Sequence, residues 1–215
     1  MSNFTYTHYK DTLKLAQSKN YKFLRCNQYS LIPSCKKLII LRHDIDFSLE
    51  NALKFAKIEA KLGIQATYFI RLHSKYYNPL ELKNYNIIQT IKNLGHEIAL
   101  HQEPDFSYIN SPSPNQYVKN QIQAFNLLFQ TQITGVSTHE PARRGIQITP
   151  ENVEEFRLEY ESYFPIFTES MKYISDSGAR WREGCMSEWI KNNEPKLYIL
   201  THPFWWYENT PLENY

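Results

Sequence analysis

Strand-like and helix-like segments alternate along most of this 215-residue chain. Short apolar runs such as LIIL at residues 38–41 are typical of buried strands. The amphipathic segment at 48–63 is typical of a helix, because Ser48 can cap its start and Gly63 can end it. This alternation favours a parallel sheet with right-handed crossovers, either open or closed into a barrel. In both architectures a ligand site lies at the carboxyl ends of the strands.

The segmentation extends over the whole chain. Strands are predicted at residues 38–41, 66–71, 97–100, 134–138, 171–175 and 197–201. Helices are predicted at about residues 7–18, 48–63, 80–95, 111–130, 149–160 and 187–193. The length suits one domain, residues 1–215, with a helical extension over about residues 1–36.

Composition excludes several classes of partner. The formal charge of +2 gives no strong field for nucleic acid or anionic lipid. No apolar run approaches the roughly 18 residues of a membrane span, and the first residues lack a secretory signal pattern. The three cysteines, Cys26, Cys35 and Cys185, are scattered and match no metal-binding spacing, which is typical of free thiols. We therefore expect a cytoplasmic protein with no nucleic-acid partner and no membrane span, whose oligomeric state the sequence leaves open.

Ionisable side chains follow every predicted strand at the point where it ends. In chain order they are Arg42, His43, Asp44 and Asp46; Arg71 and His73; His101, Glu103 and Asp105; His139 and Glu140; Asp176 and Arg180; and His202. All but two of the seven histidines, His8 and His96, are in this set. Because these strand ends meet at one edge of a parallel sheet, the pattern predicts a functional site there.

Carboxylates beside histidines suit a divalent metal ion, most readily Zn²⁺, with Fe²⁺, Co²⁺ and Ni²⁺ as further possibilities. Extended backbone would place Asp44 and Asp46 on one face, where they could share an ion. The alternative for the two aspartates is a solvated turn or a helix cap. Three protein ligands and an open position would make the metal catalytic. A spare carboxylate would then serve as a general base, and a spare histidine as a general acid.

Five stretches together resemble the polysaccharide deacetylases, the NodB-homology or carbohydrate esterase family 4 proteins. They are LRHDID, ATYFI, GHEIALH, YISDSGARW and LYILTHPFWW, and they span residues 38–206 in the family's order. The chain is most similar to a divergent branch found among surface-polysaccharide genes. The resemblance implies a distorted (β/α) barrel with fewer than eight parallel strands. It also implies metal-dependent removal of an acyl group, usually acetyl, from an amino sugar.

The resemblance also implies roles for single residues. Asp44 resembles the catalytic base and Asp46 the aspartate metal ligand, although the family's two aspartates are adjacent and these are separated by Ile45. Which of the two carboxylates has which role therefore stays open. His101 resembles the first metal-binding histidine, and His202 resembles the general acid that protonates the leaving amine. Asp176 and Arg180 resemble the groups that orient this acid and the base.

The third metal ligand departs from the family's pattern. The family has a second histidine four residues after the first, and this chain has Asp105 there. The candidates are Asp105 itself, Glu103, and His139 at the end of the next predicted strand. We favour His139, because it restores an aspartate and two histidines. Glu103 is then a ligand or a group that orients one.

The predicted substrate contacts are Arg42, Trp181 and Trp205. Arg42, Arg143 and Arg144 could hold an anionic group of the substrate or be solvated. Trp181, Trp205 and Trp206 could stack on sugar faces or belong to the buried core. The expected substrate is an amino sugar, in the form of a nucleotide-linked or lipid-linked precursor of a surface glycan. One alternative is a non-catalytic sugar-binding or assembly relative with a degenerate metal site. Another is a metal-dependent phosphoesterase, which ranks last because no glycine-rich phosphate loop is present.

Overall fold

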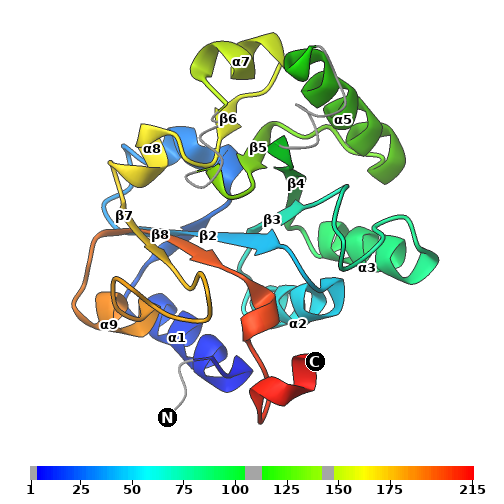
Figure 1. Cartoon of the computed structure of the whole chain (residues 1–215). Coiled ribbons are helices and arrows are strands. Elements are labelled where there is room, and N and C mark those ends of the chain that lie inside the picture. The colour runs from blue at the N-terminus through cyan, green and yellow to red at the C-terminus, as the bar shows by residue number, and fades with distance from the viewer. Residues whose placement is uncertain (1–3, 105–112, 142–147) are drawn as a thin grey trace.

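The structure is a computed structural model and describes residues 4–104, 113–141 and 148–215. Figure 1 shows the chain as a curled sheet with helices around it. In chain order the elements are α1 (Tyr6–Ser18), β1 (Lys22–Leu24), η1 (Cys26–Leu31), β2 (Leu38–Ile45), α2 (Leu49–Lys61), β3 (Thr67–Ile70), α3 (Leu82–Asn93), β4 (Glu97–Gln102), α5 (Pro114–Phe129), β5 (Gly135–Thr138), α7 (Pro150–Glu155), β6 (Tyr160–Glu161), α8 (Pro165–Thr168), β7 (Lys172–Ser175), α9 (Met186–Lys191), β8 (Lys196–Thr201), η2 (Pro203–Trp205) and η3 (Pro211–Asn214).

The sheet contains seven strands in the order β6-β5-β4-β3-β2-β8-β7, and every pair is parallel. An eighth strand, β1, lies off this path and pairs in parallel with the start of β2. Within the described residues, β6 and β7 at the two ends of the path do not pair with each other, so the barrel is open. This is the predicted distorted (β/α) barrel, with fewer than eight strands in its wall.

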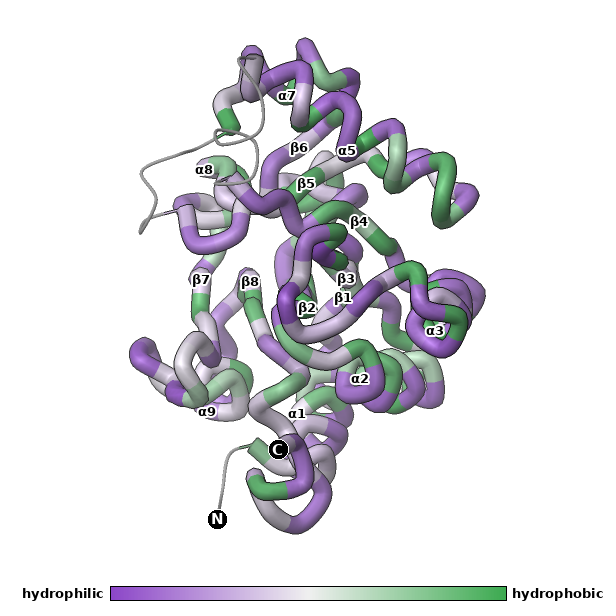
Figure 2. The backbone as a smooth tube through the Cα atoms, turned by 45° about the vertical axis from the view of Figure 1, so that its right-hand side comes forward, coloured by the Kyte–Doolittle hydropathy of each residue, from purple (hydrophilic) through white to green (hydrophobic). Residues whose placement is uncertain are grey.

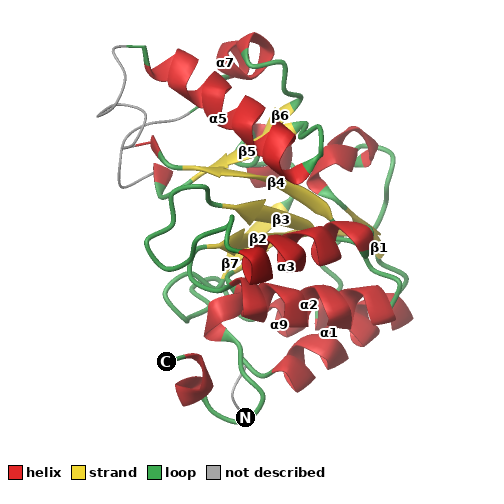
Figure 3. Ribbon diagram, turned by 90° about the vertical axis from the view of Figure 1, so that its right-hand side faces the viewer, coloured by secondary structure: helices red, strands yellow, loops and turns green. Residues whose placement is uncertain are grey.

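The helices cover the outside of the curled sheet. In Figure 3, α1, α2 and α9 lie below the strands, α7 lies above them, and α3 and α5 are drawn at the height of the strands, while the arrowheads of β3 and β4 point to the same side. Figure 2 shows hydrophobic and hydrophilic residues alternating along α3 and α5, as expected for helices with one buried face. In the part of the chain that the structure describes, no helix is long and apolar enough to cross a membrane.

The six predicted strands are present, and the structure adds β1 and β6, which have three and two residues. Strands this short leave no periodic pattern in a sequence. The helix predicted over 149–160 ends earlier, because Arg157 adopts a left-handed backbone with φ of 58° and the chain then enters β6. The segment expected to be a helical extension contains α1 and η1, but β1 between them joins the sheet.

Strand β2 has polar side chains on both of its buried faces, and all eight of its residues are buried. Arg42 reaches the interior of the barrel, where it bonds Ser137 on β5. His43 points the opposite way, toward α2, and bonds Glu59. Successive side chains of a strand alternate between faces, so Asp44 returns to the interior beside Arg42.

Glu59 is the centre of a buried network behind β2. It accepts hydrogen bonds from the hydroxyls of Tyr9 and Tyr68, the latter at 2.6 Å, and its Oε1 lies 2.7 Å from His43 Nε2. Burial raises the pKa of Glu59, but His43 and the other partners outweigh burial and lower it. The other nitrogen of His43 lies 2.6 Å from the hydroxyl of Thr201 on β8. The ionised Glu59 therefore ties two helices to neighbouring strands of the barrel.

Replacing Glu59 with glutamine should destabilise the protein by about 3 kcal/mol, because the buried donors around it lose their charged acceptor. Urea unfolding followed by circular dichroism measures this change. The control is Glu154→Gln on the exposed side of α7, which should change stability by less than about 0.5 kcal/mol. Equal stability of the two variants would contradict the importance of the network.

Candidate active site

Three predicted metal ligands meet at the carboxyl edge of the barrel. Asp46, His101 and His139 each offer one ligand atom, and these atoms all lie within 4.8 Å of one another. Asp46 Oδ1 is 3.4 Å from His101 Nε2 and 3.6 Å from His139 Nε2. The aspartate follows β2, His101 lies in β4, and His139 follows β5. The structure thus brings together the ligand set that the sequence favoured.

Both histidines are held with the same nitrogen facing Asp46. His101 Nδ1 lies 2.9 Å from the carbonyl oxygen of Ser137, which can only accept, so Nδ1 carries the proton. His139 Nδ1 lies 3.0 Å from Glu103 Oε2. Burial raises the pKa of Glu103, but His139 and Arg71 lower it more, to about 2, so this carboxylate also accepts. In both rings Nε2 is therefore the nitrogen that faces Asp46 and is placed to bind a metal ion.

The environment of Asp46 fits a cation. Its Oδ1 is buried and has no hydrogen-bond partner among the described residues. Burial raises the pKa of Asp46, but the nearby His101, His202 and His139 hold it well below its usual range. A buried, ionised oxygen without a hydrogen-bond donor, beside two imidazole nitrogens, is a favourable place for a positive ion. One carboxylate and two imidazoles form a donor set that suits zinc and related divalent ions.

Asp44 lies next to this cluster but is held by a different partner. Its two oxygens accept from Arg42 Nε at 2.9 Å and NH2 at 2.7 Å. Asp44 Oδ2 is also 3.5 Å from His101 Nε2. Burial raises the pKa of Asp44, but Arg42 and His101 lower it more, so the carboxylate is ionised. Asp44 is therefore a second carboxylate at the site, separate from the ligand group.

The position of Arg42 differs from the one expected for a substrate contact. Its side chain is fully buried, and its NH2 also donates to Ser137 Oγ at 2.6 Å. The guanidinium lies 4.2 Å from the centre of the Tyr163 ring. Because the alternation of β2 turns Arg42 into the barrel interior, it supports Asp44 from behind and does not face the site's opening.

His202 enters the site from the end of β8. Its Nδ1 lies 2.7 Å from Asp176 Oδ1, and Asp176 Oδ2 accepts from the indole nitrogen of Trp206 at 2.8 Å. Burial lowers the pKa of His202, but the hydrogen bond and charge of Asp176 outweigh it and raise the pKa to about 9. His202 Nε2 is 3.8 Å from Asp46 Oδ2. At neutral pH this ring is a cation, and its Nε2 proton faces the group formed by Asp46, His101 and His139.

Three other predicted site residues, Arg180, Trp181 and Trp205, lie within the described part of the chain. Arg180 is exposed, and its side chain makes no ion pair within the described residues. Trp205 packs against Phe47, the residue after Asp46, with ring centres 5.4 Å apart. Trp181 stacks on Phe4 at 6.2 Å. Substrate contacts of the two tryptophans stay predictions, as does the orienting role of Arg180. Asp105, Arg143 and Arg144 lie outside the described residues.

Arg71 also lies at the site, although no role was expected for it. It forms an ion pair with Glu103, and its NH1 lies 3.8 Å from Asp46 Oδ1. The signal was present in the sequence, because Arg71 directly follows the strand β3 and so belongs to the same edge. What the sequence does not show is the direction in which its long side chain reaches.

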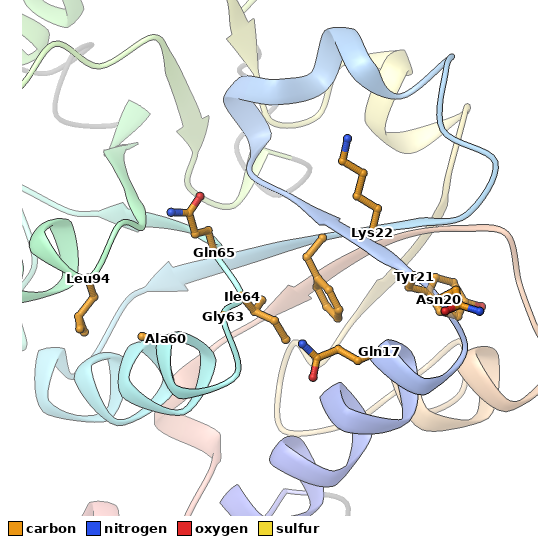
Figure 4. A pocket seen from close by; sticks show the side chains of 10 residues that line it. Gln17, Asn20, Tyr21, Lys22, Ala60, Gly63, Ile64, Gln65 and Leu94 are labelled. Carbon is orange, nitrogen blue, oxygen red and sulfur yellow. The ribbon is translucent and has the colours of Figure 1, made fainter.

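A separate cavity lies at the opposite ends of the strands. It has a volume of about 600 Å³ and is lined by residues such as Gln17, Lys22 and Gln65 (Figure 4). No carboxylate, histidine or cysteine is among the described residues that line it. Its lining therefore differs from the carboxyl edge, where carboxylates and histidines meet.

Several solved structures have a fold similar to that of this chain, and two of those described below are deacetylases. The Streptococcus pyogenes deacetylase PplD, in complex with acetate, has a TM-score of 0.52, with 12% identity over 91% of this chain and 82% of that one. A mutant of BA3943, a CE4 family pseudoenzyme with restored enzymatic activity, has a TM-score of 0.52, with 14% identity over 78% of this chain and 57% of that one.

The chitin deacetylase from the fungal pathogen Colletotrichum lindemuthianum has a TM-score of 0.50, with 13% identity over 79% of this chain and 75% of that one. No protein-family model matches the chain, and no curated protein matches its sequence. At these identities the likeness shows the fold, which is the polysaccharide deacetylase fold that the sequence motifs implied. The activity has to be argued from the site itself.

Metal content tests the ligand set. Protein purified without chelator should contain about one equivalent of divalent metal, and Asp46→Ala or His139→Ala should reduce this below about a tenth. His73→Ala, which removes a histidine outside the cluster, should leave the metal content unchanged. Elemental analysis by mass spectrometry measures all of these proteins.

The same measurement decides between the candidates for the third ligand. If His139 completes the set, Asp105→Ala should retain the metal. Loss of metal from Asp105→Ala together with its retention in His139→Ala would assign the third position to Asp105.

Proposed function

We propose that this protein is a metal-dependent hydrolase that removes an N-acyl group, in the simplest case acetyl, from an amino sugar. The observation that carries the proposal is the buried Oδ1 of Asp46. This atom has no hydrogen-bond partner among the described residues, and it faces Nε2 of His101 and Nε2 of His139. An ionised carboxylate and a protonated histidine flank this cluster. The shared fold with deacetylases supports the same activity.

Asp46, His101 and His139 would hold the ion, with Zn²⁺ as the first choice and Fe²⁺, Co²⁺ or Ni²⁺ as others. A bound divalent ion supplies a Lewis acid for the acyl carbonyl and lowers the pKa of water near it. Asp44 is suited to accept the proton of the attacking water, because it is ionised and lies beside the ligands. Arg42 holds both oxygens of Asp44 and so fixes the direction of its lone pairs.

His202 is suited to protonate the sugar nitrogen as the C–N bond breaks. Asp176 binds its Nδ1, so the other nitrogen, Nε2, is the one that can give up a proton at the site. Trp206 and the backbone N–H of His202 also bind Asp176 and keep this carboxylate in place. A base and an acid that both lie beside the ligand group are what the hydrolysis of an unactivated amide requires.

A non-catalytic, sugar-binding protein is the second candidate. One structure with this fold is a mutant of a pseudoenzyme, so the fold alone does not imply activity. The chain also has aspartate at position 105, where the resemblance expects a metal-binding histidine. The two candidates differ in metal content and in turnover of N-acetylated oligosaccharides, whereas a phosphoesterase would act on phosphate esters instead.

A cytoplasmic location and an activated sugar precursor as substrate belong to the same proposal. Cys26, Cys35 and Cys185 are all unpaired in the structure. Free thiols, two of them buried, are typical of proteins in a reducing compartment. An enzyme there would act on a nucleotide-linked or lipid-linked amino sugar before the glycan is exported.

Asp44→Asn should lower kcat for deacetylation by about 10³-fold or more while the protein keeps its metal. Asp46→Asn is the matched variant, and it should lose both metal and activity, because it changes a ligand. Acetate release from N-acetylated amino-sugar substrates and metal analysis measure the two effects. If Asp44→Asn lost the metal and Asp46→Asn kept it, the roles of the two aspartates would be exchanged.

His202→Gln separates acid catalysis from a structural role. An amide needs its leaving nitrogen protonated, so kcat for the N-acetyl sugar should fall by about 10²–10⁴-fold. Hydrolysis of an aryl acetate should fall far less, because a phenolate leaves without a proton. Equal losses on the two substrates would show that His202 does not act as the general acid.

A further inference from the structure

The two metal-binding histidines are held by different means. His101 lies within β4 and is oriented by a backbone carbonyl of the neighbouring strand, that of Ser137. His139 follows the last residue of β5 and precedes Glu140, whose backbone is left-handed with φ of 48°. Its backbone N–H still donates to the carbonyl oxygen of Gln102 on β4 at 2.9 Å, but the residue lies just beyond the end of its own strand. The contact that orients this ring is the one from Nδ1 to Glu103.

Glu103 also lies just beyond the end of its strand, β4, so it needs support of its own. This support comes from Arg71, which pairs with the same carboxylate oxygen, Oε2, that faces His139. Arg71 is 8% exposed, and its backbone N–H donates to Tyr77 OH at 3.0 Å. The tyrosine hydroxyl in turn donates to the carbonyl oxygen of Ile45, the residue before Asp46, at 2.7 Å. Arg71 is thus anchored to the strand that carries the aspartate ligand.

Arg71 contacts carboxylates on both sides of His139. Besides its ion pair with Glu103, its NH1 lies 3.8 Å from Asp46 Oδ1. His139 contacts the same two carboxylates through its two nitrogens, at 3.0 Å and 3.6 Å. The guanidinium therefore lies within ion-pair distance of both carboxylates, and its charge offsets the repulsion between them.

We propose that Arg71 is a positioning residue of the metal site, which acts through Glu103 to hold the His139 ring with Nε2 toward Asp46. The inference rests on the metal site of the proposed function, but it does not depend on which reaction follows. An outer carboxylate of this kind typically contributes 10- to 100-fold to metal affinity.

The test uses Co²⁺, whose absorption changes on binding, with the full-length protein freed of metal. Arg71→Met should weaken Co²⁺ binding about 10-fold, and Arg71→Lys should restore part of the loss. Glu103→Ala should weaken binding by a similar or larger factor. Adding Arg71→Met to Glu103→Ala should then change the affinity by less than about twofold, because nothing is left for the arginine to position.

The inference is overturned if Arg71→Met binds Co²⁺ as tightly as the unchanged protein, or more tightly. It is also overturned if the effects of Arg71→Met and Glu103→Ala multiply in the double variant, since the residues would then act independently. Lys83→Met is the matched control, because it removes the basic member of an exposed ion pair with Glu50 at 2.7 Å, and it should leave the affinity unchanged. Thermal unfolding followed by circular dichroism shows that each variant is folded.

These outcomes are separate from those that test the reaction. If the unchanged protein binds Co²⁺ but does not release acetate from any N-acetylated sugar, the proposed function fails and the role of Arg71 stands. If the protein deacetylates sugars and Arg71→Met has unchanged metal affinity, the proposed function stands and this inference fails. If the unchanged protein binds no Co²⁺, both fail.

Discussion

The buried pair of Arg42 and Asp44 is the interaction on which the rest of the site depends. Removing two charges from water costs several kcal/mol per ion, and attraction within a pair offsets this only when the remaining polar atoms are bonded too. Here Arg42 also bonds Ser137 and faces the ring of Tyr163. The pair shows that the side chains of Arg42 and Asp44 point to the interior of the barrel. Asp46, two residues after Asp44, points to the same side and joins His101 and His139.

Much of the fold could be predicted, because buried strands leave continuous apolar runs and the helices between them carry caps. The meeting of Asp46, His101 and His139 at one edge could also be predicted, since the strand ends of a parallel barrel converge there. The direction of Arg42 could not. Every residue of β2 is buried, so the sequence does not show which face is turned to the interior and which to α2. The reach of Arg71 is similar, because a long flexible side chain can contact several neighbouring strand ends.

The aromatic residues show a second limit of sequence reasoning. Trp206 and Trp205 are adjacent, yet Trp206 is fully buried and bonds Asp176, whereas Trp205 packs against Phe47 near the site. A tryptophan has both a large apolar surface and one polar hydrogen, so composition alone does not separate these two uses. Trp206 is a core residue because its partner Asp176 is buried, and the burial of Asp176 is a property of the assembled barrel.

The position of His139, directly after β5, has a consequence for how a site at this edge can change during evolution. Neighbouring strand ends of the barrel point at a common centre, so several backbone positions can supply a side chain to the same point in space. A histidine absent from one strand end can be replaced by one from the next, with no change in strand order. The chemistry of this edge can thus persist while the spacing of its motifs drifts, and a search that relies on fixed spacing would pass over the chain.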